Sequence, residues 1–147
     1  MKKYLVIFLL AVALTGLGSC TKHHHALPTF PVPTWSVDTT GKYSATMTAV
    51  VLVPPDLQPY VLRADQLAAF VGEECRGTAT LVRSGSVEAF FVLIHGDPSE
   101  DVKLSFKYYS DWKATMYTTT AFLKFTVDGS YGSADGPQVL VMNGVRR

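Results

Sequence analysis

The stretch YSATMTAVVLV, residues 43–53, alternates between apolar and polar side chains over most of its length. One face would carry the apolar set, Tyr43, Ala45, Met47, Ala49, Val51 and Val53. The other face would carry Ser44, Thr46 and Thr48. Because successive side chains of a strand point to opposite faces, this period of two predicts a β-strand with one buried face.

Further strand-like runs follow this stretch, separated by turn residues at intervals of roughly 8–12 residues, as is typical of sandwiches and barrels. They cover residues 66–72, 75–82, 87–95, 101–110, 114–120, 122–127 and 138–143. The best helix candidate, 59–70, leads directly into the strand-like Phe70-Val71-Gly72. We therefore predict an all-β fold, an antiparallel β-sandwich (Ig-like or jelly-roll-like) of about eight or nine strands. It forms a single domain over residues 35–147.

The N-terminus, MKKYLVIFLLAVALTGLGSC, has the layout of an export signal. Lys2 and Lys3 precede an apolar run over residues 4–14. This run is shorter than the roughly 20 residues that a membrane-spanning helix needs, and it matches a secretory signal. Leu17-Gly18-Ser19-Cys20 resembles the lipobox of bacterial lipoproteins, in which the cysteine is acylated and becomes the first mature residue. An ordinary signal peptide with a chance cysteine is the alternative.

We expect a signal peptide over residues 1–19 and lipidation at Cys20, which would anchor the protein in the cell envelope. The outer membrane is the expected site, with the periplasmic or surface face left open. Removal of Lys2 and Lys3 would take the formal net charge from +1 to about −1. No Lys/Arg cluster marks a basic stripe, so a nucleic-acid partner is not expected.

Residues 20–34 are predicted to form a tether behind the lipidated cysteine. Proline-rich chains favour an extended conformation of about 3.1 Å per residue, so this segment would reach about 40 Å. Its three adjacent histidines, His23, His24 and His25, cannot all face one ion with fixed geometry. We interpret them as part of a polar spacer rather than as a metal site.

Cys75 lies in VGEECRGTAT, residues 71–80, on a predicted strand. If Cys20 carries lipid, the chain has no second thiol to form an internal disulfide with Cys75. No further ligand stands at zinc-binding spacing either. Free cysteine is among the most often buried residue types, so Cys75 is predicted to be a buried structural thiol.

Three neighbours of this motif are also expected to be structural. Arg76 is predicted to pair with Glu74 or Asp65 through the planar contact that a guanidinium favours. Gly77 would allow close approach of a neighbouring chain or a bulge. Asp65, just before a strand, is expected to accept backbone N–H bonds in a turn.

The stretch KYYSDWKATMY, residues 107–117, contains the candidate ligand-binding residues. Tyr109 is expected to face outward, since Tyr108 shares the apolar face of its strand. Exposed aromatic rings offer a large contact area for a sugar ring or a partner chain. The candidate site is therefore Tyr109, Asp111, Trp112, Lys113 and Tyr117. Aromatic residues that merely cap the end of a sandwich are the structural alternative.

Three patches follow one another in an order that resembles a known module: DQLAAFVGEECRGTA (65–79), FFVLIHG (90–96) and LSFKYYSD (104–111). The pattern Ala-Ala-Phe-Val-Gly, Cys-Arg-Gly and Phe-Lys-x-Tyr is similar to that of uncharacterised Bacteroidales-type lipoproteins and cell-surface β-sandwich modules. The resemblance covers about 110 residues and implies a β-sandwich without an assigned chemistry. Surface-exported members often carry acidic residues after the lipidated cysteine, where this chain has Thr21-Lys22-His23.

No catalytic motif of the Gly-x-Ser-x-Gly, His-Glu-x-x-His or P-loop kind is present. The acidic loops 95–101 and 128–136 lack the ligand spacing of an EF-hand. We therefore expect no metal and no cofactor. The function expected is a non-catalytic binding or structural module for a glycan or another envelope protein. The alternative is a small envelope hydrolase acting on glycans or esters.

Overall fold

The computed structural model describes residues 26–85 and 87–146, so the predicted signal peptide, Cys20 and the three histidines lie outside the described residues. The described chain is all-β, as predicted, with a single turn of 3-10 helix, η1. The elements are β1 (Ala45–Leu52), η1 (Gln58–Tyr60), β2 (Gln66–Val71), β3 (Glu74–Ser84), β4 (Val87–Gly96), β5 (Lys103–Ser110), β6 (Thr115–Thr119), β7 (Leu123–Lys124), β8 (Ser130–Tyr131), β9 (Gln138–Val139) and β10 (Met142–Gly144).

Every run predicted to be a strand contains at least part of one, and β8 is the strand that the sequence did not indicate. The alternation that predicted β1 is confirmed, since Ala45, Met47, Ala49 and Val51 are all buried on one face. The predicted hairpin is present as well. Val71 pairs with Glu74 across a turn in which Gly72 has a φ of 58°, a value that favours glycine.

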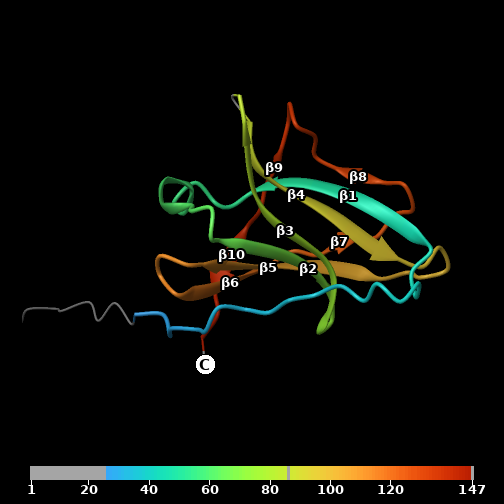
Figure 1. Ribbon diagram of the computed structural model, residues 1–147, viewed down its shortest axis with the longest axis horizontal. Helices are drawn as coiled ribbons and strands as arrows, with labels where there is room; N and C mark the ends of the chain where they lie inside the picture. Colours follow the sequence, from blue (N-terminus) through green and yellow to red (C-terminus); the bar gives the residue numbers. More distant parts are fainter. Residues whose placement is uncertain (1–25, 86, 147) are drawn as a thin grey trace, which may run out of the picture.

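The strands form one curled sheet, in the order β10-β6-β5-β2-β3-β4-β1-β8, with β7 beside β5 and β9 beside β1. The long strand β3 joins the two halves, because its first part pairs with β2 and its last part with β4. Figure 1 shows β1 and β4 above β2 and β5. The prediction of a purely antiparallel arrangement is wrong, because β8 and β9 run parallel to β1. After β7 the chain crosses to the edge of the sheet beside β1. There β8 and β9 run in the same direction as β1.

The core lies between the two halves of the curled sheet. The rings of Phe90 from β4 and Tyr108 from β5 meet edge to face, with centroids 5.9 Å apart. Around them, both halves contribute fully buried aliphatic side chains, including Val51, Leu67 and Ile94. Removal of this apolar surface from water is the main stabilising contribution to a domain of this size.

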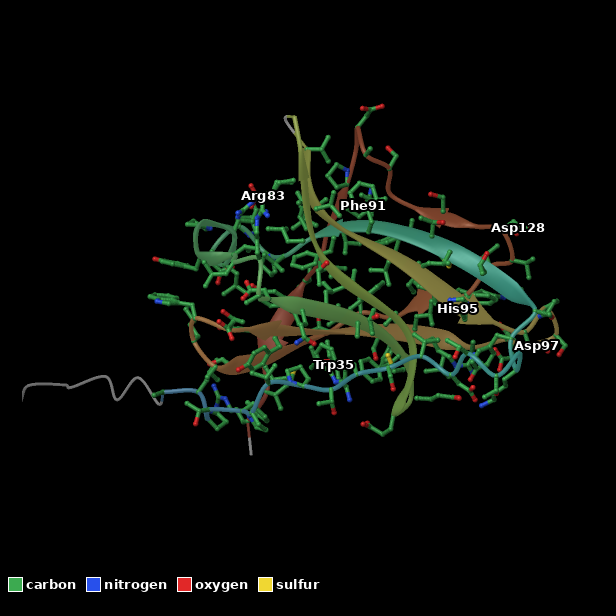
Figure 2. The ribbon with its side chains drawn as sticks, in the orientation of Figure 1. Trp35, Arg83, Phe91, His95, Asp97 and Asp128 are labelled. Carbon is green, nitrogen blue, oxygen red and sulfur yellow. The ribbon has the colours of Figure 1, made fainter. Side chains whose placement is uncertain are left out.

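The outer face of the β2–β5 half is covered by residues 26–44, which we call the strap. The indole of Trp35 packs edge-on to the ring of Phe70, with centroids 5.7 Å apart. The N–H of Phe30 donates to the carbonyl of Ala114 at 2.7 Å. Figure 1 shows the strap running beneath β6, β5 and β2, and Figure 2 shows Trp35 on it.

The start of the strap is also fixed to the domain. A Cβ at Gly144 in β10 would lie 2.3 Å from Cδ1 of Leu27, so the leucine side chain occupies the space above this glycine. Residues 26–34, predicted to belong to an extended tether, therefore lie against the domain in the structure. The chain length left between Cys20 and the folded part is correspondingly shorter.

Candidate functional site

Two of the five candidate ligand-binding residues are buried, which corrects the expectation that they form an outward cluster. Tyr109 is 3% exposed, because the strap covers its face of β5, and its hydroxyl donates to the carbonyl of Phe30 at 3.4 Å. Tyr117 is 8% exposed and pairs in register with Tyr108, so it faces the core. Neither ring is available to a ligand.

The other three candidates, Asp111, Trp112 and Lys113, lie at the turn between β5 and β6, where Trp112 gains a partner that the sequence did not suggest. Trp112 is 59% exposed and stacks on Tyr60 of η1, with ring centroids 4.8 Å apart and planes 9° from parallel. The ammonium group of Lys113 lies 4.9 Å from the Tyr60 centroid and 5.7 Å from the Trp112 centroid, within cation–π range. We call Tyr60, Leu62, Trp112 and Lys113 the aromatic tip.

A buried carboxylate holds the two loops of the aromatic tip together. Asp65 is fully buried; its Oδ2 accepts from the N–H of Leu62 at 2.9 Å and its Oδ1 from the N–H of Asp111 at 2.8 Å. The Tyr108 hydroxyl adds a third bond of 2.5 Å to Oδ2. Burial is the main cause that raises the pKa of Tyr108 well above its ordinary value, and the hydrogen bond to the Asp65 carboxylate is the second. The phenol therefore stays protonated and donates this hydrogen bond. The loops that carry Tyr60 and Trp112 are thus preorganised.

The turn after Trp112 is itself tight. Ala114 has a φ of 46°, in the left-handed region that non-glycine residues rarely adopt. Its N–H donates to the carbonyl of Asp111 at 3.2 Å, and its carbonyl accepts the bond from the strap. These bonds fix the conformation of the turn, and with it the position of the exposed indole.

A cleft of about 500 Å³ lies beside η1, which contributes Gln58 to its lining. Its walls come from β1, β3, β4 and the loop before β9, and they expose polar and apolar surface in similar amounts. The apolar side chains that line it include Val53, Val61, Leu81, Phe90 and Pro137. Gln58, Glu88 and Asp135 add polar groups. The volume lies within the range of about 300–1,000 Å³ that is usual for ligand pockets.

Arg76 is buried at the opposite end of β2 from Asp65, with 3% exposure. Its two terminal nitrogens bond to the two carboxylate oxygens of Glu100 at 3.0 and 2.9 Å, and its Nε bonds to Glu74 at 3.3 Å. The centroid of the Tyr43 ring, in the strap, lies 4.1 Å from the guanidinium carbon. Of the two predicted partners, Glu74 is present, whereas the bidentate partner is Glu100. Through these contacts Arg76 holds the strap, the β2–β3 hairpin and the β4–β5 loop together.

Cys75 is a free thiol with intermediate exposure rather than a fully buried one. It pairs in register with Phe70, so it lies on the strap-covered face, where the strap shields it only in part. Burial is the main cause that raises the pKa of its thiol, opposed by a bond to the Gly77 carbonyl and by the charge of Lys107. The raised pKa favours the neutral thiol, which is the weaker nucleophile. Gly77 passes close to β4, since a Cβ there would lie 2.4 Å from the Leu93 carbonyl oxygen.

The acidic side chains of loop 95–101 are engaged in the turn of the loop and in ion pairs. The carboxylate of Asp97 accepts from the N–H and hydroxyl of Ser99, and Glu100 is bound to Arg76. Figure 2 places His95 and Asp97 at the end of the molecule away from Arg83. Within residues 26–85 and 87–146, no three His, Cys, Asp or Glu side chains gather where they could hold a metal ion. None of the described residues belongs to a helix long and apolar enough to cross a membrane.

Comparisons of the chain with protein-family models, with curated proteins and with solved structures found no match in any of the three. Among the residues that shape the candidate site, sequence reasoning identified Trp112, Lys113 and Asp65 and missed Tyr60 and the cleft. The Leu57-Gln58-Pro59-Tyr60 stretch carries no alternation, and its proline-rich context indicates only a turn.

Proposed function

We propose that this protein is a lipid-anchored lipoprotein of the cell envelope that acts as a non-catalytic binding module for another envelope protein. The sequence support for the anchor is Leu17-Gly18-Ser19-Cys20 behind a signal-like apolar run. The observation that supports binding is the cleft beside η1. Its mixed lining, in which apolar side chains lie beside the acidic Glu88 and Asp135, suits a peptide segment that presents an apolar side chain next to a lysine or arginine.

A protein ligand suits the cleft better than a glycan does. Sugar rings pack on open aromatic faces, and the aromatic side chain that lines the cleft, Phe90, is 1% exposed. Glu88 is paired with Arg83 at 2.8 Å, whereas Asp135 has no ion pair among the described residues. A basic ligand group would thus meet Asp135 at the mouth of the cleft.

The finer fold assignment belongs to the same proposal. We propose that the two halves of the curled sheet act as the layers of a β-sandwich, supported by the contact of Phe90 with Tyr108 across the core. We also propose a relationship with Bacteroidales-type lipoprotein modules. Its support is the Asp65 to Gly77 motif, whose charged and glycine residues have structural roles here.

Metabolic palmitate labelling tests the anchor. The wild-type chain should incorporate label and the Cys20→Ala variant should not. Equal labelling of both chains contradicts the lipoprotein assignment.

Peptide display on the mature chain tests the cleft. We expect enrichment of peptides that combine apolar and basic side chains. Ala134→Trp, which fills the mouth of the cleft, should lower their affinity at least tenfold, a loss of about 1.4 kcal/mol. Thr48→Trp, exposed on β1 outside the cleft, is the matched control and should bind as the wild type does. The cleft assignment is refuted if no peptide is enriched or if Ala134→Trp has no effect.

The hydrolase alternative is tested with chromogenic glycosides and esters. We expect no turnover above that of a blank preparation. Turnover that disappears on substitution of a single Asp or Glu would replace the binding module with an enzyme.

A further inference from the structure

The aromatic tip presents large apolar side chains that neither the core nor the cleft uses. Tyr60 is 44% exposed and Leu62 is 41% exposed, beside the still more exposed Trp112. The Asp65 carboxylate binds the backbone on both sides of this group, so these side chains project from one rigid surface rather than from independent loops. The stacked rings of Tyr60 and Trp112, with the exposed Leu62 two residues along the chain, form the kind of exposed apolar group that indicates a contact surface.

The chain enters the domain at the same end. Phe30 of the strap is hydrogen-bonded to Ala114, two residues after Trp112. Figure 1 shows the first described residues, η1 and the β5–β6 turn together at one end of the molecule. Between Cys20 and Ala26 the chain has six peptide units, which reach about 20 Å at most when fully extended. A lipid on Cys20 therefore keeps this end of the domain near the membrane surface.

The chemistry of the aromatic tip matches the interfacial layer of a bilayer. Tryptophan and tyrosine are enriched at this depth, because their rings are apolar and their N–H or O–H groups remain hydrated. Lysine extends its ammonium group towards headgroup phosphates while its stem stays on apolar surface. The flanking charges balance one another: Arg63, Asp56 and Asp111 are exposed, and Lys113 is partly exposed. Binding would thus depend on the rings more than on anionic lipid.

We propose that the aromatic tip rests in the interfacial layer of the same membrane that holds the N-terminal lipid, as a second and weaker contact. The proposal rests on the lipid anchor proposed above. The contact orients the domain with the β5–β6 turn towards the membrane and the β4–β5 loop away from it. Because η1 carries Tyr60 on the tip and Gln58 at the cleft, the cleft then opens beside the membrane surface.

Fluorescence quenching by brominated lipids tests the contact in the lipidated, full-length protein. The protein is reconstituted in vesicles of phosphatidylethanolamine and phosphatidylglycerol with dibrominated acyl chains. The chain has two tryptophans, Trp35 and Trp112. We expect quenching in the wild type and in Trp35→Phe, and loss of quenching in Trp112→Phe. Quenching that is absent, or that persists in Trp112→Phe, overturns the proposal.

A second arm separates this proposal from the lipoprotein assignment. The mature chain, with Cys75→Ser, is coupled through Cys20 to a maleimide-bearing lipid in the same vesicles. Quenching that depends on Trp112 in this arm supports the tip contact even if palmitate labelling fails. No such quenching on coupled vesicles, together with Trp112-dependent binding to a glycan array, assigns the tip to a glycan and overturns the membrane contact.

Discussion

A buried charged side chain lies near each end of β2, and the two charges are stabilised differently: Asp65 directly precedes the strand, and Arg76 lies on the neighbouring β3. Asp65 receives three hydrogen bonds from uncharged donors, two of them backbone N–H groups. Arg76 instead forms a bidentate ion pair with Glu100 and lies against the ring of Tyr43. One end is therefore fixed by hydrogen bonds to loops close by, and the other by side chains drawn from distant segments.

This difference determines which partners of each charge can be removed by mutation. Two of the donors to Asp65 are main-chain groups, so removal of the carboxylate leaves partly buried N–H groups that no exchange of their side chains can remove. The partners of Arg76 are side chains, each of which can be replaced singly or together. Substitution of Asp65 should accordingly lower the free energy of unfolding more than substitution of Arg76.

Asp65→Ala should cause the largest loss of stability, about 3–5 kcal/mol in the free energy of unfolding, because the buried Tyr108 hydroxyl and two partly buried N–H groups lose their acceptor. Urea denaturation of the mature chain measures this value. Asp56→Ala, at an exposed position on the neighbouring loop, is the control and should change it by less than about 0.5 kcal/mol. Equal effects of the two substitutions would contradict the role given to Asp65.

Arg76→Met should cost less, about 2–3 kcal/mol, because Glu100 is partly exposed and regains water when its partner is removed. Arg83→Met removes an exposed ion pair with Glu88 and should cost under about 1 kcal/mol. Denaturation midpoints of both variants decide the comparison. A loss at Arg83 as large as that at Arg76 would show that burial does not set the difference.

The Arg76 end should also make stability fall in acid. Hydrogen bonds from Lys42 and then Tyr43 lower the pKa of Glu74 to about 2, and Arg76 lowers the pKa of Glu100. Because both folded-state pKa values lie below the ordinary value of 4.5, the ionised carboxylates stabilise the fold above that pH. This contribution is lost as the pH falls towards 2. Melting temperatures of wild type and Glu74→Gln/Glu100→Gln, measured from pH 6 to 2, should converge at the acid end; parallel curves contradict the assignment.

Trp112→Ala should have the smallest effect on stability, within about 0.5 kcal/mol, because most of the indole is already in water. Tyr109→Ala, two strand positions before the turn, removes a buried ring and should lower the melting temperature clearly. Thermal unfolding of both variants shows whether the aromatic tip is separable from the fold. A large drop for Trp112→Ala would mean that the stack with Tyr60 is part of the core.

The local sequence pattern predicted the structure correctly where only one face of a strand packs on the core. The buried face of β1 follows from alternation alone, and the β2–β3 turn follows from Gly72. Alternation correctly placed Tyr108 inside, but it could not show that the opposite face of β5 is covered too. That cover is the strap, and a proline-rich stretch without periodicity gives no sign that it packs on a sheet.

The features that the sequence did not predict depend on contacts between segments far apart in the chain. The pairing of Arg76 with Glu100 depends on where the β4–β5 loop ends, which spacing along the chain does not reveal. Tyr60 reaches Trp112 because Asp65 draws two loops together, and only the acidic member of that arrangement has a recognisable turn signal. The candidate site could thus be predicted in part, from the exposed tryptophan but not from its stacking partner.

The parallel pairing of β8 and β9 with β1 has a consequence for the order of folding. Val51 pairs with Gln138, so the edge of the sheet beside β1 closes only after nearly the whole chain is present. Contacts between such distant residues carry a large entropic cost of loop closure and slow the folding of β-rich domains into the range of milliseconds to seconds. A chain that emerges N-terminus first during synthesis would therefore pass through a stage with β1 paired to β4 on one side only. A chain shortened to end at Thr126 should remain in that open stage, which rapid hydrogen exchange along β1 would reveal.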